Sequence, residues 1–241
     1  MPRTTDRPAL ARYAVTGLVL VIGAALATWA ALKLGGGPGP VEQALDDVRR
    51  LPLIGPVMAD NPSVESRMRT TIEEELRNPT LNGPSRPFQL VIELRRQYVV
   101  PALRSADDAS ALAALAARAD FARYLRKADP AACRQFAMGA LQRPDLLDGE
   151  GKRLFEIVLA TLEAAWRYGK VANRPQPVLT RDELSASLRA AGFGPDDFER
   201  MNSLPKQSNE AVCDIELKLD SVPPLLPEDR RGAFARTILS N

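Results

Sequence analysis

The chain of 241 residues contains no histidine. Histidine is the usual general base near neutral pH and a frequent metal ligand. Its absence excludes Ser-His-Asp and Cys-His hydrolases and every zinc site that uses an imidazole ligand. Mechanisms that use carboxylates, lysine or tyrosine stay open, but the sequence favours a protein that is not an enzyme.

The chain also lacks an excess of charge of one sign. Residues 1–40 hold four of the 32 Lys and Arg side chains and one of the 30 Asp and Glu side chains, which leaves 28 basic and 29 acidic residues in the rest. Nucleic-acid binding depends on a strongly positive surface. We therefore expect no nucleic-acid partner.

Aromatic residues are few, at 5% of the chain, whereas alanine, leucine and arginine are abundant. This composition favours helix over sheet. The connections between helical stretches are short, as in compact helical domains. We expect an all-α protein in which one N-terminal transmembrane helix precedes an orthogonal bundle of about seven to nine helices.

An apolar stretch without a charged residue extends over residues 14–32. At about 1.5 Å per residue its length matches a bilayer core of about 30 Å. Three arginines precede this stretch and only Lys33 closely follows it, so the positive-inside rule keeps the N-terminus in the cytoplasm. We predict a single-pass signal anchor in a bacterial inner membrane, with the C-terminal domain in the periplasm.

The prediction divides the chain into four parts. Residues 1–13 form a cytoplasmic tail, residues 14–33 the anchor, residues 34–40 a hinge rich in glycine and proline, and residues 41–241 the periplasmic domain. A cleaved signal peptide is the alternative, because the small residues at 25–27 resemble a cleavage site. Both interpretations place the domain outside the cytoplasm.

The chain has two cysteines, Cys133 and Cys213. In an oxidising compartment two cysteines most simply form a disulfide. Asp129 and Pro130 predict a helix start just before Cys133, and a helix N-terminus lowers the pKa of a thiol. A reactive thiol and two free buried thiols are therefore alternatives, but we predict a disulfide between Cys133 and Cys213.

Apolar residues recur at helical spacing along the domain. One stripe contains Val64, Met68, Ile72 and Leu76. The apolar face of the next stretch, residues 86–104, includes an arginine, Arg95, and Pro101 should kink or end that helix. Residues 208–220 also alternate in the manner of a strand, although we expect a helix.

The stretch 51–58 is apolar and contains two prolines, so it cannot form a long helix. It either packs as an extended segment over its own domain or provides a surface for a membrane-protein partner. The side chains expected at such a contact are Leu51, Leu53, Ile54, Val57 and Met58.

Two pairs of adjacent carboxylates, Asp107–Asp108 and Asp196–Asp197, stand at predicted helix starts, where capping and the helix dipole explain them. We expect no catalytic, cofactor-binding or metal-ligating residue, and no cofactor. The leading hypothesis is a non-catalytic, membrane-anchored periplasmic protein that binds or positions another envelope protein. The alternative is a membrane-tethered enzyme that uses carboxylates.

Overall fold

A computed structural model describes residues 39–80, 85–139, 141, 143–172 and 174–240. The regular elements in these ranges are helical, and none of the described residues lies in a β-strand. The prediction of an all-α protein is confirmed. The described chain is divided into more and shorter helices than the roughly seven to nine that short connections suggested.

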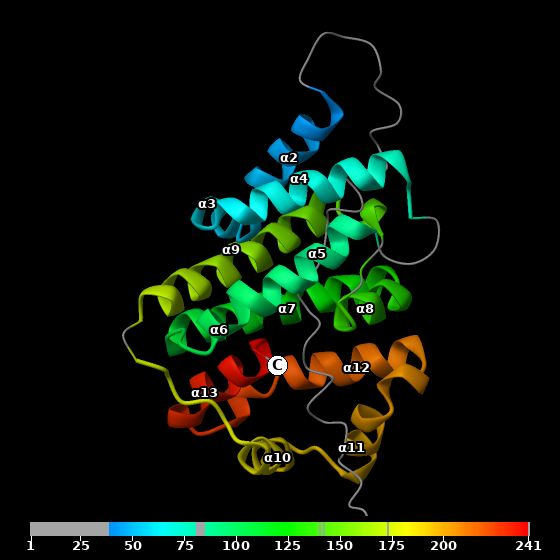
Figure 1. Ribbon diagram of the computed structural model, residues 1–241. Helices are drawn as coiled ribbons and strands as arrows, with labels where there is room; N and C mark the ends of the chain where they lie inside the picture. The colour runs from blue at the N-terminus through cyan, green and yellow to red at the C-terminus, as the bar shows by residue number, and fades with distance from the viewer. Residues whose placement is uncertain (1–38, 81–84, 140, 142, 173, 241) are drawn as a thin grey trace, which may run out of the picture.

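The N-terminal helices pack around their own hydrophobic cluster, in which Leu45, Met68 and Phe88 are buried. These helices are α2 (Pro40–Arg50), α3 (Ile54–Asp60), α4 (Pro62–Arg77) and α5 (Arg86–Leu94). A proline stands in the first turn of α2, α4 and α5, where the missing N–H has no helical partner to lose. Helices α2, α3 and α4 lie at the top of Figure 1.

The predicted stripe on α4 is buried only in part. Val64, Met68 and Ile72 are inaccessible to solvent, but Leu76 is 38% exposed. Residues spaced by four turn about 40° further round the helix at each step, so Leu76 points about 120° away from Val64. The buried position in the last turn belongs to Glu75, whose carboxylate accepts hydrogen bonds from the backbone N–H of Thr80 and Arg86.

Helix α5 continues into a π-helical segment, Arg95–Val99, and then into α6 (Val100–Leu103). Pro101 has no N–H to donate, and the helix ends two residues after it, as the sequence predicted. Arg95 opens the π-helical segment with its side chain turned into the protein interior.

The remaining helices form the larger body of the protein. They are α7 (Asp108–Ala128), α8 (Pro130–Ala137), α9 (Gly149–Val171), α10 (Arg181–Ala190), α11 (Pro195–Asn202), α12 (Asn209–Asp220) and α13 (Glu228–Leu239). Helix α7 packs against α8, α9, α12 and α13. Its Phe121 meets the ring of Phe136 on α8 edge to face, at 5.0 Å between centroids, and lies 5.4 Å from that of Phe155 on α9.

The predicted disulfide between Cys133 and Cys213 is present and joins α8 to α12, with 5.6 Å between the Cα atoms. Both cysteines are buried. The helix start predicted at Asp129 is confirmed as well, because its side chain accepts from Ala131 N–H at 2.8 Å. Ser208 caps α12 by accepting from Ala211 N–H at 3.2 Å. Residues 209–220 are therefore helical, which excludes the strand interpretation.

Gly169 lies inside α9, which extends to Val171. A Cβ atom on Gly169 would lie 1.8 Å from the carbonyl oxygen of Ala102. Glycine at this position lets the backbones of α6 and α9 approach closely.

The predicted anchor, residues 14–33, lies outside the described residues. Among the residues that are described, no helix has the length and apolar character that crossing a bilayer requires.

Loss of the disulfide should lower the free energy of unfolding substantially. The two cysteines are 80 residues apart, and closing a loop of that size corresponds to about 4–5 kcal/mol in the chain-entropy model. Replacing both cysteines with alanine should produce a loss of this order in urea denaturation. Unreduced, unfolded wild-type protein should show no reactive thiol, and labelling of two thiols would contradict the bond.

Candidate functional site

The connection between α10 and α11 builds the first candidate site. The N–H of Phe193 donates to the carbonyl of Leu188, and the N–H of Gly192 donates to that of Arg189, which together form a Schellman motif. The motif requires a left-handed residue after the helix, and Gly192 supplies it with φ of 86°. Phe193 and Leu188 are both buried, so the turn directs the Phe193 ring inward.

Helix α12 holds this turn in place through Lys218. Its Nζ donates to the carbonyl of Gly192 at 3.0 Å and to the carboxylate of Asp197 at 2.6 Å, and it lies 4.5 Å from the centroid of the Phe193 ring. Asp197 also accepts from the N–H of Gly194 at the start of α11. The ammonium group of Lys218 keeps the pKa of Asp197 below its ordinary value. The acidic pair 196–197 is therefore a helix-start feature, as its position suggested.

The resulting surface, called here the α10–α11 groove, has a volume of about 730 Å³. Its walls are lined by Arg189, Phe193, Pro195, Phe198, Glu199, Asn202 and Ser203. The ring of Phe198 is half-exposed, 6.4 Å from that of Phe193, and the guanidinium carbon of Arg189 lies 5.4 Å from its centroid. The groove thus combines two aromatic rings and a proline with a polar rim, the composition typical of a protein-binding surface.

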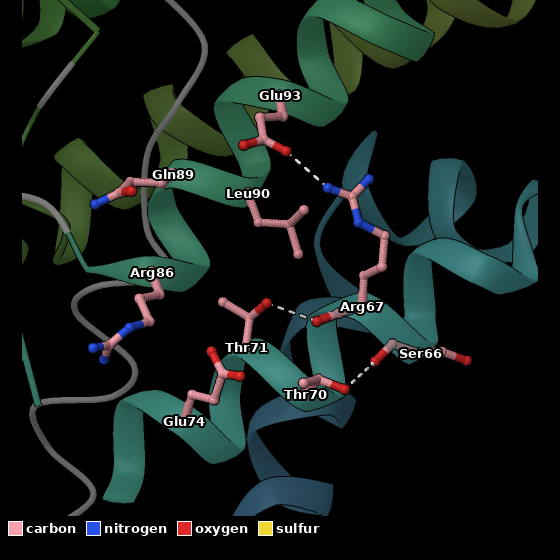
Figure 2. Close-up of a pocket in the computed structure, with 9 residues that line it drawn as sticks. All are labelled: Ser66, Arg67, Thr70, Thr71, Glu74, Arg86, Gln89, Leu90 and Glu93. Atoms are coloured by element: carbon pink, nitrogen blue, oxygen red, sulfur yellow. Dashed lines mark hydrogen bonds and ion pairs between the residues drawn. The ribbon is translucent and has the colours of Figure 1, made fainter. Parts of the chain in front are cut away.

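A second groove of about 480 Å³ lies between α4 and α5. Its lining residues are Ser66, Arg67, Thr70, Thr71, Glu74, Arg86, Gln89, Leu90 and Glu93. Figure 2 shows the ion pair between Arg67 and Glu93 crossing from one helix to the other at one end, with Arg86 at the other end and Leu90 between them.

The polar groups of this α4–α5 groove are largely committed to the protein itself. The hydroxyls of Thr70 and Thr71 donate to backbone carbonyls one turn earlier. Arg86 donates to the carbonyl of Asn78 at 2.6 Å and lies beside Glu75. With opposite charges paired across it and one leucine at its base, the groove is a weaker candidate for binding than the α10–α11 groove.

A buried ionic network links α7 to α12. The guanidinium of Arg118 hydrogen-bonds to Glu216 and lies 3.5 Å from an oxygen of Asp220. The side chain of Asp220 is completely buried, and neither of its oxygens has a hydrogen-bond partner. No local sequence pattern indicates this network, because its arginine and its acids are far apart in the chain.

Burial has the largest effect on the pKa values of Asp220 and Glu216. It raises the pKa of Asp220 to about 8, with a further increase from the charge of Glu216 and an opposing effect of Arg118. Burial also raises the pKa of Glu216, against the lowering effect of Arg118. Desolvation lowers the pKa of Arg118, but the two carboxylates outweigh it and raise that pKa above its ordinary value. At neutral pH the network therefore favours a protonated Asp220.

Carboxylates with a raised pKa are candidates for acid–base catalysis, but these two lie under packed helices rather than in a groove. Asp220 is closed off from solvent and Glu216 is 13% exposed. The described residues contain no group of three or more histidine, cysteine or acidic side chains that could hold a metal ion. We interpret the network as structural.

The segment 51–58 is part of the protein interior. Leu53, Ile54, Val57 and Met58 are buried, and Leu51 is half-buried. Leu53 and Val57 contribute to the core of the larger body, while Ile54 and Met58 contribute to the N-terminal cluster. The surface of the described chain therefore does not present these side chains, and a partner contact through them stays a prediction.

The conformation of this segment also differs from the extended one expected. Residues 54–60 form the short helix α3, and Leu53 precedes it with φ of 65°, a left-handed conformation that is rare for leucine. Its N–H donates to a carboxylate oxygen of Glu163 on α9 at 2.8 Å. Burial of the leucine and this hydrogen bond offset the backbone strain.

Comparison with known proteins supplies no relative for this chain: no family model, no curated protein sequence and no solved structure matches it.

The raised pKa of Asp220 predicts that stability falls as pH rises. The folded protein retains a proton on Asp220 up to about pH 8, whereas the unfolded chain releases it near pH 4, so the folded state loses relative stability between these values. The free energy of unfolding, measured in urea from pH 5 to pH 8, should decrease less steeply in Asp220→Asn than in wild type. Asp214→Asn, at a half-exposed position on the same helix, is the control and should retain the wild-type slope. An unchanged slope in Asp220→Asn would contradict the assignment.

Proposed function

We propose that this protein is a membrane-anchored envelope protein whose helical domain binds another envelope protein through the α10–α11 groove. The observation that carries the proposal is the aromatic lining of this groove beneath a polar rim. Aromatic walls with charged or amide groups at the edge suit an apolar side chain from a partner helix or loop.

The construction of the groove supports this function. Phe193 is fixed by the Schellman turn and by Lys218, so it provides a rigid base. Phe198 packs against the larger core with one part of its ring and leaves the rest accessible to a partner. A rigid apolar site of this kind reduces the conformational entropy that binding has to overcome.

The proposal includes the location inferred from sequence. Residues 14–32 would cross the inner membrane with the N-terminus in the cytoplasm, and residues 41–241 would lie in the periplasm. The uncharged run and its arginine-rich flank support this location. The disulfide between Cys133 and Cys213 is consistent with an oxidising compartment.

An enzyme that uses carboxylates is the weaker alternative. The two acids with raised pKa, Glu216 and Asp220, are engaged with Arg118 in the interior. A substrate could reach Asp220 only after α7 and α12 separated. Turnover that disappeared on replacing a single aspartate or glutamate would favour this alternative over the binding function.

The retained anchor gives one prediction. Protein isolated from native membranes should have the intact mass of a chain that still carries residues 1–32, because an uncleaved signal anchor remains attached. It should also resist extraction by alkaline carbonate. A mature N-terminus near Thr28 would show that a signal peptide had been removed.

Truncation of Phe198 should weaken partner binding. Partners would be identified by cross-linking from position 202 on the groove rim, and the purified partner would then be titrated against the purified full-length chain. Phe198→Ala should reduce the affinity by about tenfold or more, as expected for a central aromatic contact. Its circular dichroism should stay close to wild type, whereas its melting temperature should fall modestly, because the partly buried ring also packs against the larger core.

Tyr168→Ala is the matched control, since it removes another exposed aromatic ring, on α9 outside the groove. It should bind like wild type. Equal affinities of Phe198→Ala and wild type, or a loss confined to Tyr168→Ala, would refute the α10–α11 groove as the binding site.

A further inference from the structure

Arg95 carries a buried positive charge that the described protein does not neutralise. The residue is 4% exposed, and its one hydrogen bond runs from Nη2 to the carbonyl oxygen of Leu239 at 3.0 Å. Its Nε and Nη1 atoms are buried and have no hydrogen-bond partner. No carboxylate among the described residues forms an ion pair with it.

The other two arginines that the structure describes as buried have carboxylate partners. Arg118 is paired with Glu216 and Asp220. Arg236 is paired with Asp108 and also donates to two backbone carbonyl oxygens. Among the arginines that the structure describes as buried, Arg118 and Arg236 each have a carboxylate partner and Arg95 has none.

The charged side chains that act on Arg95 are positive, and the partial negative charge at the C-terminal end of α13 is the one opposing contribution, through the carbonyl of Leu239. Burial, followed by the charges of Arg118 and Arg96, lowers the pKa of Arg95 to about 10. The guanidinium is therefore still charged at neutral pH. A buried charge without a counterion is strongly unfavourable, and structures that contain one usually provide a partner for it.

We propose that Arg95 is the centre of an anion-binding site that takes a small oxyanion, of which a carboxylate is the best fit. A guanidinium has five N–H donors, and the carbonyl of Leu239 occupies one of them. Because that bond uses one hydrogen of Nη2, a pair of parallel N–H groups remains on another edge of the group. Such a pair binds a carboxylate or a phosphate through two hydrogen bonds.

The backbone at this position supports the assignment. Arg95 is the first residue of the π-helical segment, which separates α5 from α6. Single π-helical turns inside α-helices frequently occur at functional sites. The site would be formed by this segment and by the C-terminal end of α13, at a location separate from the α10–α11 groove. The two proposals therefore stand or fall independently.

The test measures the thermal stability of the full-length protein while sodium formate, acetate or phosphate is titrated at constant ionic strength set by sodium chloride. An anion that binds the folded state and not the unfolded chain raises the melting temperature until the site saturates. Wild type should show a saturable rise with formate or acetate. A rise with phosphate alone would retain the oxyanion site but assign it to phosphate rather than to a carboxylate.

Variants locate the effect. Arg95→Met, which keeps much of the side-chain length without the charge, should show no saturable rise. Arg95→Lys keeps the charge but lacks the paired N–H groups, so its midpoint should move to concentrations at least ten times higher. Arg96→Gln, at the exposed neighbouring position, should respond like wild type.

Two results would overturn the proposal. One is the absence of a saturable rise in wild type with all three oxyanions, which needs no variant to fold. The other is a wild-type response that persists unchanged in Arg95→Lys, because the anion would then bind elsewhere.

Discussion

The position of α12 is the constraint on which the other features depend. The disulfide from Cys133 to Cys213 fixes it covalently to α8, and Arg118 holds it to α7 through Glu216 and Asp220. On its outer side, Lys218 fixes the turn between α10 and α11. One helix therefore connects the core to the groove, and a displacement of α12 would disturb the buried network and the α10–α11 groove together.

The buried charges show how that position is specified. An ion pair in the interior contributes little net stability, because desolvation offsets most of the attraction. A shift of α12 along α7 is far more unfavourable, since it leaves a buried charge without a partner. Arg118 therefore selects one register of α12 against α7, while the disulfide limits the distance over which α12 can shift. Because Asp220 is protonated at neutral pH, the packing of α12 against α7 has one fewer buried charge to neutralise.

Local features of the chain were predictable from the sequence, and tertiary ones were not. Asp129 identifies a helix start because a capping side chain acts within a few residues. Arg118 and Glu216 are 98 residues apart, so no local pattern joins them. Arg95 did give a signal, as a charged residue on an apolar helix face. Hydrophobicity alone does not distinguish a core segment from a docking surface, so the sequence left both roles open for the apolar stretch 51–58.

The segment 51–58 and the α10–α11 groove differ in whether a side chain can be changed without disrupting the fold. Ile54 is buried in the N-terminal cluster and Val57 in the larger core, so a polar substitution at either position would disrupt packing before any contact with a partner could be measured. Phe198 differs because it rests on a base that Phe193, Gly192 and Lys218 form without it. Removal of its ring leaves those contacts in place. A surface is suited to recognition where its side chains can vary while the residues beneath them keep the fold. Among the apolar regions of the described chain, the α10–α11 groove meets that condition best.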